Sequence, residues 1–199
     1  MAHFNISDGL DFLRGCVVDF DPLSGLSSRA PIIQRHLSQL SGMFADAEAY
    51  ADLVQRSDPL LYAYHALDIP QTPGDLSFGC SVLYPGKVGN EYFFTKGHYH
   101  EKRDTGEVYH CLRGHGYMML ENAQGDWAAL EVRAGQVCYV PRFYAHRSIN
   151  VSPREPFVTL FVYRADAGHD YGTIQTKGFR KLLVEQDGEP VVVDNPNWK

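Results

Sequence analysis

From about Leu60 onward the chain consists of short strand-length segments, and this pattern restricts the fold more than any other feature. Segments of four to eight residues rich in Val, Tyr, Phe and Leu alternate with turns rich in Gly, Pro, Asn and Asp. Strands this short at regular spacing are typical of an all-β sandwich or barrel. Two more short strands are expected between Phe179 and Val193, around the turn Gln186-Asp187-Gly188. We therefore expect an all-β barrel over about residues 60–185.

The N-terminal part has a different, helical pattern. Between Ala30 and Val54, apolar residues recur at steps of three or four, with Ser41-Gly42 as the expected interruption. We expect one or two short helices there, packed on the outside of the barrel as part of a helical N-terminal extension over about residues 1–59. The sequence has no obvious linker, so we expect a single domain over residues 1–199.

Composition limits the functional classes. The formal net charge of −6 gives no basic footprint for nucleic acid. The four cysteines form no C-x-x-C pair, the start of the chain lacks the apolar core of a signal peptide, and the longest apolar runs are only strand-length. We expect a cytoplasmic protein without a nucleic-acid partner or a membrane segment. An anionic substrate would need a local binding site, because the overall field of the protein is negative.

Three histidines and one glutamate are candidate metal ligands. His98 and His100 are two residues apart in a strand-like run, where alternate side chains point to the same face. Glu107 follows a turn and opens the next expected strand, and His146 lies in a further strand-like stretch. Three imidazoles and a carboxylate suit a first-row divalent metal such as Fe, Mn, Ni or Zn. An H-x-H pair alone is common, so the prediction depends on the combination.

This combination resembles the two sequence motifs of the cupin superfamily. The second motif is carried by four residues: Gly135, Pro141, His146 and Asn150. Phe143 stands where cupins usually carry glycine. In the first motif, six residues separate the second histidine from Glu107, where three or four are usual. This longer spacer resembles the cupin-type glucose-6-phosphate isomerases first recognised in archaea. Four longer segments are similar to the same branch: Asp58–Tyr62, Val82–His100, Asp166–Ile174 and Val193–Trp198.

The resemblance implies a jelly-roll barrel of the cupin type that acts as a homodimeric, metal-dependent aldose–ketose isomerase. The implied reaction interconverts glucose 6-phosphate and fructose 6-phosphate. The implied cofactor is a divalent metal, with Fe²⁺ first and Mn²⁺, Ni²⁺ or Zn²⁺ as alternatives, bound by His98, His100, Glu107 and His146. The candidate catalytic residues are Glu107, Tyr163 and His169. From the residues alone, Tyr163 could also be a barrel-core aromatic, and His169 could be an ordinary loop histidine.

Binding of the phosphate group needs hydrogen-bond donors. Thr95 and Gly97 directly precede the metal histidines, and a hydroxyl and an unobstructed backbone N–H there could bind phosphate oxygens. Strand alternation is expected to turn Lys96 away from them. The resemblance adds three candidates for substrate binding: Tyr62, Ser81 and Tyr171.

The residues leave three other functions open. A metal-dependent dioxygenase would use the same ligands with iron and oxygen. A mannose-6-phosphate isomerase would differ only in the configuration at C2 of its substrate. A non-catalytic cupin that senses a sugar is the alternative outside enzymes.

Overall fold

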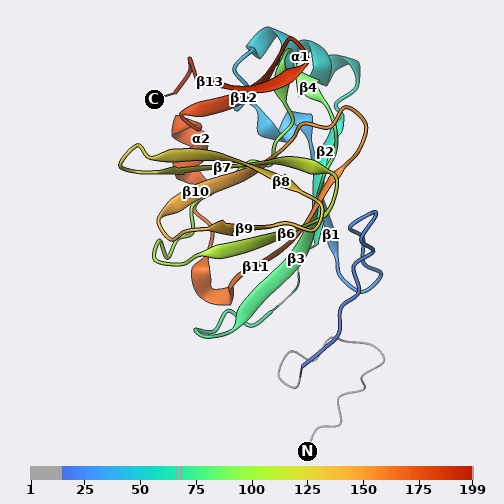
Figure 1. Cartoon of the computed structure of the whole chain (residues 1–199), viewed down its shortest axis with the longest axis vertical. Coiled ribbons are helices and arrows are strands. Elements are labelled where there is room, and N and C mark those ends of the chain that lie inside the picture. Colours follow the sequence, from blue (N-terminus) through green and yellow to red (C-terminus); the bar gives the residue numbers. More distant parts are fainter. Residues whose placement is uncertain (1–14, 66, 68, 199) are drawn as a thin grey trace, which may run out of the picture.

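The computed structural model describes residues 15–65, 67 and 69–198. In this part of the chain most elements are strands, arranged in three antiparallel sheets (Figure 1). The six-stranded sheet contains, in spatial order, β1 (Ile32–His36), β2 (Leu60–His65), β3 (Leu76–Leu83), β11 (Phe157–Arg164), β6 (Glu107–Arg113) and β9 (Val137–Val140). The three-stranded sheet contains β10 (Tyr144–Asn150), β7 (His115–Asn122) and β8 (Trp127–Arg133).

The four-stranded sheet and the helices complete the fold. The sheet contains β13 (Glu189–Asp194), β12 (Lys181–Gln186), β5 (Glu91–Tyr92) and β4 (Lys87–Val88). The helices are η1 (Leu37–Leu40), α1 (Ala47–Arg56), η2 (Ala165–Ala167) and α2 (Gly172–Lys177), where η denotes a 3₁₀ helix. In the described part of the chain, no helix is long and apolar enough to cross a membrane.

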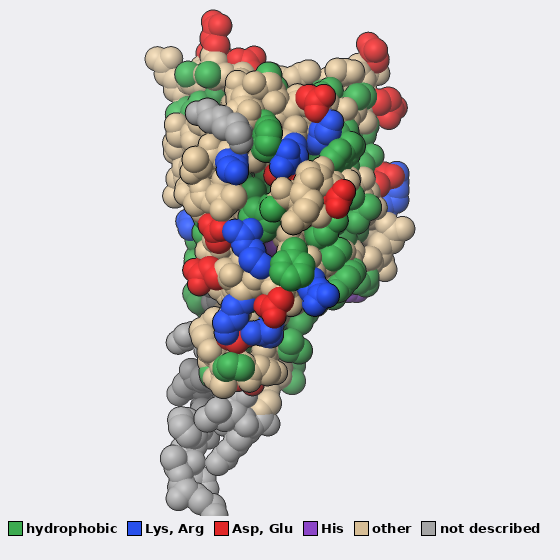
Figure 2. All heavy atoms as spheres, turned by 90° about the vertical axis from the view of Figure 1, so that its left-hand side faces the viewer, with side chains coloured by type: hydrophobic (Ala, Val, Ile, Leu, Met, Phe, Trp, Pro, Cys, Tyr) green, Lys and Arg blue, Asp and Glu red, His purple; other side chains and the backbone are tan. Residues whose placement is uncertain are grey.

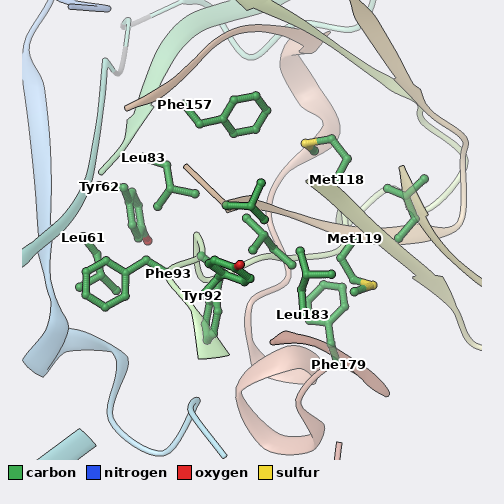
Figure 3. Packing of buried hydrophobic residues seen from close by; sticks show 14 of the residues in the cluster. Leu61, Tyr62, Leu83, Tyr92, Phe93, Met118, Met119, Phe157, Phe179 and Leu183 are labelled. Atoms are coloured by element: carbon green, nitrogen blue, oxygen red, sulfur yellow. The ribbon is translucent and has the colours of Figure 1, made fainter. Parts of the chain in front are cut away.

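Side chains from all three sheets meet in one hydrophobic core. Figure 3 shows Leu83 of β3, Met118 of β7 and Leu183 of β12 converging on the same interior. In β6, alternate residues are buried, which directs Glu107 and Tyr109 inward and leaves Val108 at the surface. The expectation of an all-β barrel with short helices outside is confirmed.

The N-terminal helical prediction is right for one part and wrong for another. The helix α1 lies on the outside of the barrel, with Asp46 capping it by accepting a hydrogen bond from the Ala49 N–H (Figure 1). Residues Ile32–His36, however, form a strand that pairs with β2. The β-branched pair at the start of this segment favours a strand, and pairing with β2 satisfies its backbone groups. The part of the expected extension in residues 1–14 lies outside the described residues.

The strand-like run that carries His98 and His100 is not a regular strand in the structure. Beyond β5 this segment makes isolated bridges, among them His98 with His146 and Tyr99 with Asp170. The C-terminal hairpin forms as expected, with β12 and β13 joined by Asp187 and Gly188 at φ values of 53° and 85°. Two positive φ values are typical of a type I′ turn, which suits a two-residue hairpin loop.

Asn150 joins β10 to neighbouring segments through buried hydrogen bonds. Its Nδ2 group donates to the carbonyls of Leu83 and Glu155, each at 2.9 Å, and its Oδ1 atom accepts from the Ser152 N–H at 2.9 Å. We expect Asn150→Ala to lower the free energy of unfolding by about 3 kcal/mol, because buried partners are left unsatisfied. Urea unfolding measures this. Asn90→Ala, at an exposed position, is the control and should change little; equal effects of both substitutions would contradict the prediction.

Candidate metal centre

The four predicted ligands come together inside the barrel from three separate segments. Glu107 is the first residue of β6, His146 lies in β10, and the irregular segment after β5 supplies His98 and His100. One ligand atom from each lies within 4.8 Å of those of the other three. The Glu107 Oε2 atom is 2.8 Å from Nε2 of His146 and 3.1 Å from Nε2 of His100. The four side chains therefore lie together, as the sequence predicted.

The electrostatic environment favours the protonation states that metal ligands need. Burial alone would raise the pKa of the Glu107 carboxyl, but His146 and His100 beside it lower this pKa well below its ordinary value. Burial, reinforced by the neighbouring His146, lowers the pKa of His98 well below its ordinary value. An ionised carboxylate and a neutral imidazole are the forms that bind metals.

His100 is oriented by a residue that the sequence analysis did not single out. The Thr105 hydroxyl donates to the Lys102 carbonyl at 2.7 Å, so its oxygen is free to accept from Nδ1–H of His100, also at 2.7 Å. This bond orients the His100 ring so that Nε2 is directed to the cluster, where it would be the nitrogen that binds a metal. Such second-shell bonds orient metal-binding histidines in many proteins.

The donor set fits a divalent metal. Nε2 of His98 is buried and has no hydrogen-bond partner among the described residues, which is costly unless some group binds it. A cation held by the three imidazoles and the carboxylate would use this nitrogen and neutralise the buried charge of Glu107. The structure thus offers a complete set of first-row metal ligands.

A cavity of about 480 Å³ opens onto this cluster, and His98 and Glu107 form part of its wall. The ring of His169 lies 4.4 Å from that of His98, and the Tyr163 ring lies 5.3 Å from that of His169. The five residues predicted to bind substrate also line the cavity: Tyr62, Ser81, Thr95, Gly97 and Tyr171. His100 and His146 complete the cluster from buried positions.

Two cations in the wall were not assigned to the site from the sequence. Lys96 lines the cavity together with Thr95 and Gly97, contrary to the expected alternation. Gly97 has a φ of 76°, so the segment is not a regular strand there, and a glycine inside a strand pattern was the available signal. Arg35 reaches the cavity from β1, opposite Tyr62 of β2, in a segment interpreted as helix.

Tyr109 is a further residue that sequence reasoning missed. It lines the cavity and lies two positions after Glu107 on the same face of β6. Its ring is 5.7 Å from that of His146, and burial raises its pKa well above the ordinary value. Alternation along β6 was the signal that could have found it.

The fold and the cluster define a class: a β-barrel protein with a three-histidine, one-carboxylate centre facing an interior cavity. A family model described as glucose-6-phosphate isomerase (GPI) matches residues 34–199. The glucose-6-phosphate isomerase of Pyrococcus horikoshii is 49% identical over 185 residues, which cover 93% of this chain and 96% of that protein. That of Thermococcus kodakarensis is 46% identical over 190 residues, covering 96% and 100%. The chain belongs to the glucose-6-phosphate isomerase family, and the resemblance seen in its sequence is confirmed.

Other matches are more distant. A protein of Rhizobium meliloti named putative glucose-6-phosphate isomerase 1 is 37% identical over 188 residues, covering 93% of this chain and 87% of that protein. Among solved structures, a mutant of Bacillus subtilis oxalate decarboxylase aligns with a TM-score of 0.44 at 20% identity, covering 54% of this chain and 26% of that chain. An oxalate oxidase aligns with a TM-score of 0.42 at 12% identity, covering 76% and 57%.

The Thr105–His100 hydrogen bond generates a prediction about metal affinity. Thr105→Val keeps the shape of the side chain but removes the hydroxyl acceptor for Nδ1–H of His100, leaving the longer contact to the Thr105 carbonyl at 3.3 Å, so we expect metal affinity to fall by about 10–100-fold. Competition with a chelating dye measures it. Thr105→Ser keeps the hydroxyl and should restore most of the affinity. Thr176→Val, at an exposed position of α2, is the matched control; equal affinities of the two valine variants would contradict the prediction.

Proposed function

We propose that this chain interconverts glucose 6-phosphate and fructose 6-phosphate in a metal-dependent reaction. The observation that supports the proposal is that one cavity presents both the His/Glu cluster and two cations, Arg35 and Lys96. A sugar phosphate needs both features, one for its reacting oxygens and one for its phosphate. The volume of about 480 Å³ falls within the range of small-molecule sites.

The chemistry is divided between the metal centre and the cavity wall. A divalent metal bound by His98, His100, Glu107 and His146 would supply a Lewis acid for the adjacent oxygens on C1 and C2. Burial lowers the pKa of His169, so its imidazole is neutral near pH 7 and can accept a proton from the sugar. The Tyr163 hydroxyl remains protonated because burial raises its pKa, which makes it a hydrogen-bond donor to a substrate oxygen.

Arg35 and Lys96 are the proposed charge partners of the phosphate. Neither forms an ion pair with an acidic residue in the described part of the chain. Burial and the neighbouring charge of Arg35 lower the pKa of Lys96, so the two cations repel each other. A phosphate dianion between them removes this repulsion, while the Thr95 hydroxyl and the Gly97 N–H offer neutral donors.

Four further features belong to the proposal. Fe²⁺ is the proposed native metal, ahead of Mn²⁺, Ni²⁺ and Zn²⁺. A homodimer is proposed, supported by apolar side chains on the outer face of β9, where Val137 is 62% and Tyr139 63% exposed; sedimentation velocity would contradict it by finding only monomers. We also propose that the protein acts in the cytoplasm and as a single domain.

The central test is an isomerase assay with and without metal. Fructose 6-phosphate should be converted to glucose 6-phosphate, a chelator should abolish the conversion, and divalent metals should restore it to different extents. Coupled assays for glucose 6-phosphate and for mannose 6-phosphate separate the two possible products. Conversion that persists after the metal content has fallen to zero would contradict the metal-dependent reaction, and formation of mannose 6-phosphate alone would contradict the assigned substrate.

If Arg35 and Lys96 bind the phosphate group, their loss should weaken binding of fructose 6-phosphate and leave binding of the free sugar unchanged. Replacing both cations, as Arg35→Gln with Lys96→Met, should raise KM for fructose 6-phosphate by about 10²–10⁴-fold, since charge-assisted hydrogen bonds contribute about 1.5–3 kcal/mol each and about 1.4 kcal/mol corresponds to tenfold. We expect free fructose to be a very poor substrate of the wild type, and its turnover should be the same in the double variant. Lys87→Met, which removes a cation outside the cavity, is the control. An equal loss with both sugars would show that the pair supports the fold rather than the phosphate.

A further inference from the structure

A second hollow, of about 510 Å³, lies beside α2 and the turn after β7. This side of the molecule faces the viewer in Figure 2, where several lysine and arginine side chains gather. Four cations line the hollow, and we call it the basic groove: Arg103, Arg142, Lys177 and Arg180. It shares no lining residue with the catalytic cavity.

The basic groove has an excess of positive charge. Among the described residues, Glu121 is the only acidic one that lines the groove, and one of its carboxylate oxygens accepts a hydrogen bond from the Arg180 backbone N–H at 2.7 Å. Arg103 is paired with Asp170 at 2.6 Å. The other three cations form no ion pair with an acidic side chain in the described part of the chain. In a protein of formal charge −6, such a local concentration of cations is a feature that needs a counter-charge.

Aromatic rings hold the guanidinium groups of the basic groove in place. The guanidinium carbon of Arg180 lies 4.0 Å from the Trp198 ring centroid, and that of Arg103 lies 3.8 Å from the Tyr99 centroid. The Nε atom of Arg180 is buried and has no hydrogen-bond partner among the described residues. Because these ring faces already carry cations, the groove offers charge and N–H donors rather than a surface for stacking a base.

We propose that the basic groove is a second anion site, which binds the phosphate group of a small ligand. Planar guanidinium groups match the oxygens of a tetrahedral oxyanion, and cations fixed by aromatic rings lose little freedom on binding it. A phosphate dianion would also supply the counter-charge that Arg142, Lys177 and Arg180 lack. This site is independent of the proposed isomerase reaction.

The test counts phosphate ions bound to the metal-loaded protein. Equilibrium dialysis with radiolabelled inorganic phosphate, at ionic strength held constant with chloride, compares the wild type with Arg142→Gln/Lys177→Gln. Both substitutions lie outside the catalytic cavity, so the isomerisation rate and the melting temperature should stay at wild-type values. We expect this variant to bind one phosphate per chain fewer than the wild type.

The catalytic-cavity variant Arg35→Gln/Lys96→Met separates the two possible locations. It should keep the phosphate of the basic groove and lose only the one bound in the cavity. Phosphate binding by Arg142→Gln/Lys177→Gln that equals the wild type in number and affinity would overturn the proposal. Loss of all bound phosphate in the cavity variant would overturn it too, because phosphate would then bind only in the catalytic cavity.

Discussion

The buried carboxylate of Glu107, surrounded by three imidazoles, is the interaction on which the rest of the structure depends. An isolated buried charge costs several kcal/mol, so the fold must bring compensating groups to it. His146 and His100 do this at 2.8 and 3.1 Å. They come from segments far apart in the sequence, and the Thr105 hydroxyl fixes one ring from behind. No local stretch could assemble this cluster, and the site therefore exists only in the closed barrel.

A second buried charge lies on β10, the strand that carries His146. Arg147 follows His146 in β10, so alternation turns it away from the metal centre. Its guanidinium carbon lies 4.0 Å from the Phe94 ring centroid and 4.5 Å from that of Phe179, and burial lowers its pKa to about 10 despite the nearby carboxylate of Glu91. Phe179 leads into the C-terminal hairpin. The hairpin thus covers the back of the strand that carries a metal ligand, which links the last part of the chain to the site.

Features that depend on local sequence patterns were predictable, whereas features that depend on contacts between segments distant in the sequence were not. The convergence of Glu107 and His146 on the histidine pair was foreseen, because local sequence patterns place one at the start of an expected strand and the other within a strand-like stretch. The position of Lys96 in the cavity wall was missed because Gly97, with a φ of 76°, interrupts the alternation of a regular strand. A Cβ at Gly97 would come within 3.0 Å of Phe179 and of Arg147. Arg35 was missed for another reason. The apolar residues around Arg35 recur at helical spacing, so the segment was predicted to be a helix. It forms a strand because it pairs with β2, which is a long-range contact.

The net negative charge of the chain explains why an anion must be bound by cations that lie close to it. At a formal charge of −6 the long-range field repels phosphates, and salt screens it within about 8 Å under physiological conditions. In the proposed reaction Arg35 and Lys96 would bind the phosphate at short range. Burial and the charge of Arg35 lower the pKa of Lys96, so the two cations repel each other in the absence of an anion. A neutral sugar cannot relieve this repulsion, whereas a phosphorylated sugar can. Under the proposed function, this pair of cations would discriminate between the two sugars before any contact with the sugar ring is made.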